Sequence, residues 1–292
     1  WCGDMAIGGT TSGGYLYTWD EWLGGVYQLR YALLDKSGAL QIPIQTLTTV
    51  SPGYLGDPGV AVAPDGNIGI AWMQVGSQQV GGNWLYNYNV YLAVLNAAGG
   101  VVLPPTNLTN NTAWGGWDAV GVPNYDYANL AASGDNRFFV TWNDYHNTES
   151  DWTNNIYYTV YSSAGQTIKA HTLFAGSDAD YADAPRVTGM SGNRFLLSYY
   201  GYGDDVRGVR VTAFSSSGNQ VAGVQQLTSN YEYPRAMTQL SNGAILVIWR
   251  YWSNSRSMLR YSLLDSTTLA IGNGPFDLAN PFSYTGDESP SV

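Results

Sequence analysis

Acidic side chains recur along this chain at one regular place, a few residues before a short apolar strand. They are Asp4, Asp57, Asp126, Asp183, Glu232 and, near the end of the chain, Asp287 or Glu288. Carboxylates repeated in this way could cap turns, collect a cation such as Ca²⁺, or act as general acid and base on a glycoside. No cofactor is expected, and the one metal candidate is Ca²⁺ at Asp57, Asp126, Asp183 and Glu232.

A second set of candidate residues consists of aromatic and imidazole side chains in the longest connections of the chain. They are Trp84, Tyr86, Tyr88, Trp114, Trp117, Tyr145, His146 and Trp152. Rings on loops can stack on the apolar faces of sugars or pack against a partner protein, and they can also pack on one another to hold long loops down. Insertions in repeat proteins tend to mark the binding face, so we predict that these residues bind a ligand.

Composition excludes several classes of function. A net charge of −10 leaves no basic surface for a nucleic-acid partner. Two His and the single Cys2 exclude a Cys/His zinc cluster and an internal disulfide. No apolar run reaches the roughly 20 residues of a membrane span. The scarcity of Lys and the sequons at Asn107 and Asn110, both candidate glycosylation sites, favour an extracellular or cell-surface location.

The strands that must position these residues come from a repeat. An apolar run ending in an aromatic residue occurs five times, at 15–19, 68–72, 138–142, 195–199 and 245–249. An apolar residue of a preceding strand lies twelve positions before each closing aromatic, and a turn and two further strands follow it. We expect the closing aromatics Trp19, Trp72, Trp142, Tyr199 and Trp249 to wedge between neighbouring repeats, because large rigid side chains fill such gaps well.

Four strands per unit of roughly 50 residues predict an all-β fold, a β-propeller with four-stranded blades. The chain holds five complete repeats plus the first strand of a sixth, in a single domain over 1–292. The blades are expected at 1–49, 50–109, 110–174, 175–228 and 229–280, and 281–292 would begin a further blade or pair with another sheet. We therefore expect the chain to be either a mature form or an excerpt of a longer protein.

Three stretches carry a resemblance to a known repeat. They are Ser289-Pro290-Ser291-Val292, the run from Asn242 to Trp249, and the run from Gly208 to Gly218. Together they resemble the β-propeller repeat modules of large secreted and cell-surface proteins of bacteria. The resemblance implies a surface or adhesion module, and the chain departs from it in its long aromatic loops and in lacking Asp-Gly-rich loops between the second and third strands.

The sequence is interpreted as a non-catalytic, extracellular binding or structural module for a glycan or a partner protein. Two alternatives stay open. One is a polysaccharide-active enzyme, of glycosidase or lyase type, that uses the acids at the mouth of the channel. The other is a structural subunit of a surface assembly, in which copies of the chain join by exchange of a terminal strand.

Overall fold

The computed structural model describes residues 2–116, 119–148, 152–175, 181–203, 206–253 and 256–278. Within these ranges the chain forms five antiparallel sheets of four strands each, and strands that follow one another along the chain are neighbours in the sheet. The predicted all-β propeller with five four-stranded blades is confirmed. The sixth-blade segment predicted at 281–292 lies outside the described residues. No helix of the described residues is long and apolar enough to cross a membrane.

The blades follow chain order. The first blade holds β1 (Cys2–Gly9), β2 (Tyr15–Leu23), β3 (Val26–Leu34) and β4 (Leu40–Val50). The second holds β5 (Gly53–Val62), β6 (Ile68–Val80), β7 (Asn83–Leu95) and β8 (Val101–Asn107). The third holds β9 (Asn124–Ala132), β10 (Arg137–Asn147), β11 (Trp152–Ser162) and β12 (Thr167–Ala175). The fourth holds β13 (Tyr181–Met190), β14 (Arg194–Gly203), β15 (Val206–Ser215) and β16 (Gln225–Gln226). The fifth holds β17 (Tyr233–Gln239), β18 (Ile245–Ser253), β19 (Arg256–Leu264) and β20 (Ile271–Asp277).

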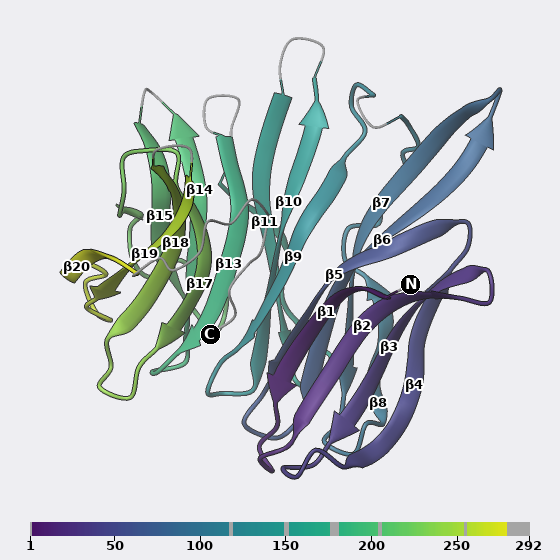
Figure 1. Cartoon of the computed structure of the whole chain (residues 1–292), viewed down its shortest axis with the longest axis horizontal. Helices are drawn as coiled ribbons and strands as arrows, with labels where there is room; N and C mark the ends of the chain where they lie inside the picture. The colour runs from purple at the N-terminus through teal and green to yellow at the C-terminus, as the bar shows by residue number, and fades with distance from the viewer. Residues whose placement is uncertain are drawn as a thin grey trace.

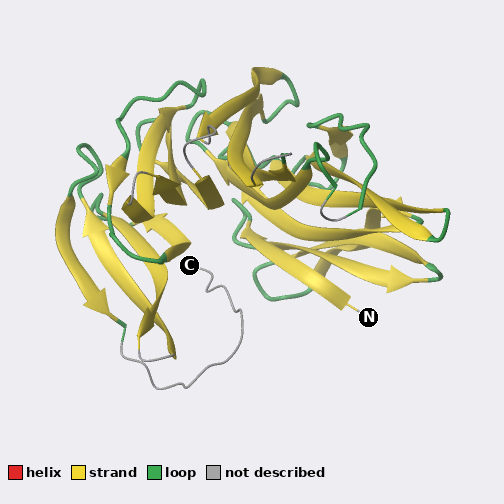
Figure 2. Cartoon of the chain, turned by 90° about the horizontal axis from the view of Figure 1, so that it is seen from above, coloured by secondary structure: helices red, strands yellow, loops and turns green. Residues whose placement is uncertain are grey.

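The blades stand side by side around a common axis (Figure 1). The first strands of the blades form the inner layer, in which β1 packs on β5, β5 on β9, β9 on β13 and β13 on β17. Seen from above, the five sheets make an arc whose two ends are the first and the fifth blade (Figure 2). Each interior blade therefore has a neighbour on both faces, as a stacked repeat requires for its core.

The core consists of the layers between the blades, and the closing aromatics lie in them. Trp72 and Trp142 are fully buried, and Trp249 is 1% exposed. Trp72 belongs to one apolar cluster with Leu16, Leu29 and Leu33 of the preceding blade. The predicted wedging is confirmed for these blades and is wrong for Trp19, which is only partly buried because no described sheet lies on its side of the first blade.

Tyrosine hydroxyls join alternate pairs of blades at their outer turns. Tyr31 on β3 donates a hydrogen bond to the carbonyl oxygen of Gly99, in the turn before β8, over 3.1 Å. The equivalent positions of the second and fourth blades hold Leu92 and Val211, so those blades cannot make this contact with the next one.

Candidate functional site

Each inner strand is interrupted by a bulge at an equivalent place. The pairing of β5 with β6 shifts between Gly56 and Gly59, and that of β13 with β14 shifts between Asp183 and Arg186. One residue in each of three bulges adopts a left-handed backbone: Asp57 with φ 48°, Tyr127 with φ 53° and Ala184 with φ 50°. A bulge re-aims the side chains beside it, and here it turns acidic side chains from neighbouring strands toward one another.

Asp57, Asp126 and Asp183, which we call the acid cluster, come from β5, β9 and β13. The carboxyl group of Asp126 is hydrogen-bonded to that of Asp57 on the adjacent blade. Burial, this hydrogen bond and the negative charge of Asp57 together raise the pKa of Asp126 to about 8. At neutral pH the Asp57–Asp126 pair therefore retains a proton between its two carboxyl groups.

Asp183 lies in a different environment. Its carboxylate accepts hydrogen bonds from the side-chain amide of Asn143 over 3.1 Å and from the backbone N–H of Ala184 over 2.6 Å. Burial raises the pKa of Asp183, while these donors, Asn154 and Arg186 oppose the rise. The donors around Asp183 oppose the rise of its pKa, whereas the contact with Asp57 adds to that of Asp126, so the two environments favour Asp183 as the carboxylate and Asp126 as the acid.

Arg186 lies among the three carboxyl groups and balances part of their charge. Burial lowers the pKa of Arg186, and the nearby charges of Asp57, Asp183 and Asp126 oppose that shift. Its guanidinium group also lies 5.5 Å from the centre of the Tyr127 ring, within the range of a cation–π contact. The cluster thus combines one bound proton, carboxylate oxygens and one cation.

Tyrosine side chains surround the acid cluster. Tyr54 and Tyr88 are hydrogen-bonded to each other, and burial followed by the charge of Tyr54 raises the pKa of Tyr88. Burial, with the charges of Asp126 and Asp183, raises the pKa of Tyr127 to about 12. Tyr145, on β10, is near enough to Asp183 for that charge to add to the effect of burial in raising its own pKa. The rings supply an apolar lining, and their hydroxyls stay protonated at neutral pH.

Of two further predicted acids, Asp4 contacts the acid cluster and Glu232 faces an arginine of its own blade. Asp4 accepts a hydrogen bond from the backbone N–H of Asp57 over 3.3 Å. Glu232 is 4% exposed and faces Arg260 of its own blade, with 3.8 Å between Oε1 and Nη1. Within the described residues no group of three or more His, Cys, Asp or Glu side chains has the arrangement of a metal site. Ca²⁺ binding by Asp57, Asp126, Asp183 and Glu232 stays a prediction.

The predicted aromatic residues differ in how far their side chains are buried. On β7, Trp84 is 52% exposed, whereas Tyr88, which shares its face of the strand, is 2% exposed and belongs to the core beneath the acid cluster. Trp114 is 41% exposed, and its ring would meet a Cβ placed on Gly76 at 3.0 Å. Tyr86 pairs through its backbone with Gly115, which ties the connection after the second blade to the β6–β7 hairpin. Trp117 and the side chain of Trp152 lie outside the described residues.

An Asp–His pair lies on β10, and of the two residues only His146 is among those predicted from the sequence. The Nδ1 atom of His146 is 3.1 Å from Oδ1 of Asp144, whose side chain is largely buried. Burial raises the pKa of Asp144, and the charge of His146 and its hydrogen bond oppose that rise. Asp144 and His146 are two residues apart on a strand, which places them on one face, a spacing the sequence does display.

The two sequon asparagines lie at the end of β8. The side-chain oxygen of Asn107 accepts hydrogen bonds from the backbone N–H groups of Thr109 and Asn110, over 3.1 and 2.9 Å. Asn110 has a φ of 50°, a conformation that asparagine tolerates well. The side chain of Asn107 thus organises this turn. Glycosylation of Asn107 or Asn110 stays a prediction.

Comparison with solved structures places the fold among β-propellers. A protein of unknown function from Dyadobacter fermentans aligns with a TM-score of 0.57 at 11% identity, over 91% of this chain and 79% of its own. A Hadza microbial sialidase aligns at 0.54 and 12%, over 93% and 59%. A polysaccharide lyase, an ulvan lyase, aligns at 0.53 and 8%, over 90% and 67%. No protein-family profile matches the sequence, and no curated protein matches it.

Proposed function

We propose that the chain is a polysaccharide-active enzyme that cleaves glycosidic bonds by general acid–base catalysis at the acid cluster. The observation that carries the proposal is the buried hydrogen bond between the carboxyl groups of Asp126 and Asp57, which helps to raise the pKa of Asp126 to about 8. A carboxylic acid that is still protonated at neutral pH is what the leaving oxygen of a glycoside requires. The sialidase and polysaccharide lyase among the structural neighbours support a glycan as the substrate.

The roles within the cluster follow from its contacts. Asp126 protonates the glycosidic oxygen, and Asp57 holds that proton ready by hydrogen bonding to the acid. Because Asp57 and Asp126 touch, they cannot stand on opposite sides of a sugar bond, which requires at least about 5 Å between the two carboxyl groups. Asp183, which accepts hydrogen bonds from Asn143 and Ala184, is therefore the residue that activates water or attacks the sugar.

The remaining residues fit the binding of a sugar chain. Tyr127 and Tyr145 present rings beside the carboxyl groups, and sugars stack well on such rings. Arg186 can hydrogen-bond a hydroxyl or carboxylate group of the substrate. An extracellular location, which the sequence favours, would place the enzyme where polysaccharides are met.

The test is reducing-end release from a panel of neutral and acidic polysaccharides by the purified chain. We expect turnover of at least one member, and Asp126→Asn and Asp183→Asn should each lower kcat by about 10²-fold or more. Glu232→Gln is the matched control, because that acid lies at the start of another inner strand but faces Arg260. Failure of every substrate, or an Asp126→Asn variant as active as the parent, would refute the proposal.

A non-catalytic glycan-binding module is the second candidate, and one observation favours it. Trp84 and Trp114 are both about half exposed on segments that the Tyr86–Gly115 pairing holds together. Two such rings could stack on a sugar chain without any chemistry. A Trp84→Ala, Trp114→Ala double variant should then lose saturable binding to a glycan panel, while Asp126→Asn keeps it. Binding that survives the double variant would contradict this candidate.

A further inference from the structure

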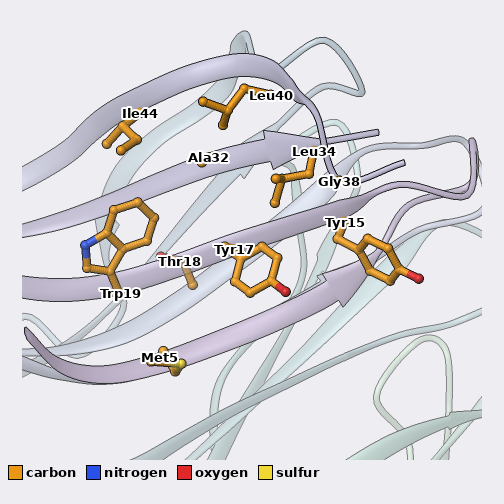
Figure 3. Close-up of a pocket in the computed structure, with 10 residues that line it drawn as sticks. All are labelled: Met5, Tyr15, Tyr17, Thr18, Trp19, Ala32, Leu34, Gly38, Leu40 and Ile44. Carbon is orange, nitrogen blue, oxygen red and sulfur yellow. The ribbon is translucent and has the colours of Figure 1, made fainter. Parts of the chain in front are cut away.

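One face of the first blade exposes a wide apolar surface, which we call the first-blade face. Met5, Tyr15, Tyr17, Leu40 and Ile44 on it are 68%, 44%, 38%, 59% and 45% exposed. Their side chains, with those of Trp19 and Leu34, line a shallow hollow of about 600 Å³ (Figure 3). Contiguous apolar surface of this kind on a soluble domain marks an interaction site.

The repeat shows what covers this face elsewhere. Tyr15 and Tyr17 lie four and two positions before Trp19, and the residues at the same places in the other four blades are buried between sheets. These equivalents are Ile68 and Ile70, Phe138 and Val140, Phe195 and Leu197, and Ile245 and Val247, each 0% exposed. In every one of these blades the cover is the preceding blade. The first-blade face is therefore built to receive a blade.

The face of a blade that covers the next blade is made of a particular set of residues. The second blade is covered by Leu16 on β2 and by Leu29, Tyr31 and Leu33 on β3. The fifth blade repeats this set in the same register, because Leu246 pairs with Leu263 and Ile248 with Tyr261, as Leu16 pairs with Leu33 and Thr18 with Tyr31. Leu246, Leu259, Tyr261 and Leu263, the fifth-blade face, lie at the other end of the arc, and each is partly exposed.

The turn glycines show the same contact between each blade and the preceding one. A Cβ placed on Gly99 would meet the Cδ1 atom of Ile42 at 2.2 Å, and one on Gly165 would meet Leu103 at 3.0 Å, because each turn lies on the preceding blade. Around the equivalent Gly38 of the first blade no atom lies within 4 Å of such a Cβ. The first-blade face thus has an open glycine turn, and Tyr261 is placed like Tyr31, which donates a hydrogen bond to Gly99.

We propose that the first-blade face of one copy of this chain binds the fifth-blade face of a second copy, head to tail. The two faces are complementary in type because they repeat the interface between the first and second blades, and Tyr261 would donate to the carbonyl oxygen of Gly38 across the contact. Within the described residues the two faces stand at opposite ends of the arc (Figure 2), and a second copy of the chain can bring them together. A heterologous interface of this kind generates a closed ring or an open chain of copies.

The test is the mass of the protein in solution, by sedimentation or light scattering, from micromolar to near-millimolar concentration. The parent chain should grow with concentration from monomer to dimer and larger species. Tyr17→Asp, on the first-blade face, and Leu263→Asp, on the fifth-blade face, should each weaken association at least tenfold. Tyr202→Asp is the control, because Tyr202 is also 38% exposed but lies on β14, away from both faces.

An equimolar mixture of Tyr17→Asp and Leu263→Asp separates this interface from other modes of association. Each variant keeps one intact face, so the mixture should form dimers and nothing larger. Association of Leu263→Asp alone would instead indicate two first-blade faces in contact and would overturn the proposal. A parent chain that stays monomeric throughout the concentration range, with native circular dichroism, would overturn it without recourse to any variant.

Discussion

The hydroxyl group of Tyr158 donates a hydrogen bond to the carbonyl oxygen of Gly218, 2.9 Å away, and so joins β11 of the third blade to the outer turn of the fourth. Tyr31 and Gly99 make the same contact between the first and second blades. Tyr261 occupies the equivalent place in the fifth blade, and its hydroxyl makes no such hydrogen bond within the part of the chain that the structure describes. The three tyrosines thus share one position and differ in whether a following blade lies beside them among the described residues.

This difference predicts a contrast between two conservative variants. Tyr158→Phe should lower the free energy of unfolding by about 1 kcal/mol, because it leaves the buried carbonyl of Gly218 without its donor. Tyr261→Phe should change it by less than about 0.5 kcal/mol in dilute solution. Urea denaturation of both variants measures this, and equal losses would show that the hydroxyl of Tyr158 contributes nothing through Gly218.

Truncation of the closing aromatics should depend on the blade in the same way. Trp142→Ala removes a fully buried ring that stacks on Tyr157 and should cost about 3–5 kcal/mol. Trp19→Ala, at the equivalent place on the first-blade face, should cost less than about 2 kcal/mol, since its ring is only partly buried. Chemical denaturation at low protein concentration provides the comparison, and a cost for Trp19→Ala as large as for Trp142→Ala would argue against an open face.

Asp57 should control the pH range over which the proposed enzyme works. Activity that needs a protonated Asp126 falls as the pH rises through the pKa of that group, near 8. Asp57→Asn removes the negative charge that helps to raise this pKa, so the alkaline limb of kcat should move to lower pH. Asparagine tolerates the left-handed backbone at this position, so the bulge should persist. An alkaline limb that does not move would exclude the Asp57 charge as the cause of the raised pKa.

Asp20 offers a test on stability alone. Its side chain is 2% exposed, its Oδ1 atom has no hydrogen-bond partner among the described residues, and burial is the main cause that raises its pKa to about 6. The folded state therefore binds the proton more tightly than the unfolded chain, and stability is lost as the pH rises from about 4 to about 6. Asp20→Asn should remove this loss and stabilise the protein by roughly 1 kcal/mol above pH 7. Urea denaturation across this pH range checks the prediction, and a parental pH profile in the variant would contradict it.

The sequence predicts the fold well because the same pattern of four strands occurs five times. The period-2 apolar runs, the closing aromatics and the turn glycines all mark the same four strands, so an ambiguity in one blade is resolved by the others. The fate of Trp19 could not be predicted from its own blade. Its burial depends on whether a sheet lies against it, which is a property of neighbouring blades and of the arc they form.

The candidate site was predicted only to the level of its strands. Asp57 lies three positions before Val60, whereas Asp126 lies four before Leu130, so the acids are not equivalent members of a symmetric ring. The bulges turn this offset into the contact between Asp57 and Asp126, and a bulge leaves little trace in an apolar pattern. Tyr88 shows a related limit, because alternation on β7 places it on the face of Trp84 without saying how far each lies from the core.

The bulges on the inner strands bear on whether the proposed reaction needs a conformational change first. Asp126 and Asp183 stand on strands whose ladders continue on both sides of the irregularity, so their positions are fixed when the chain folds. No movement of β9 or β13 is then needed before the carboxyl groups are in place. The rate of the proposed reaction should then follow the chemical step or the escape of product, and single-turnover kinetics should show no lag before bond cleavage.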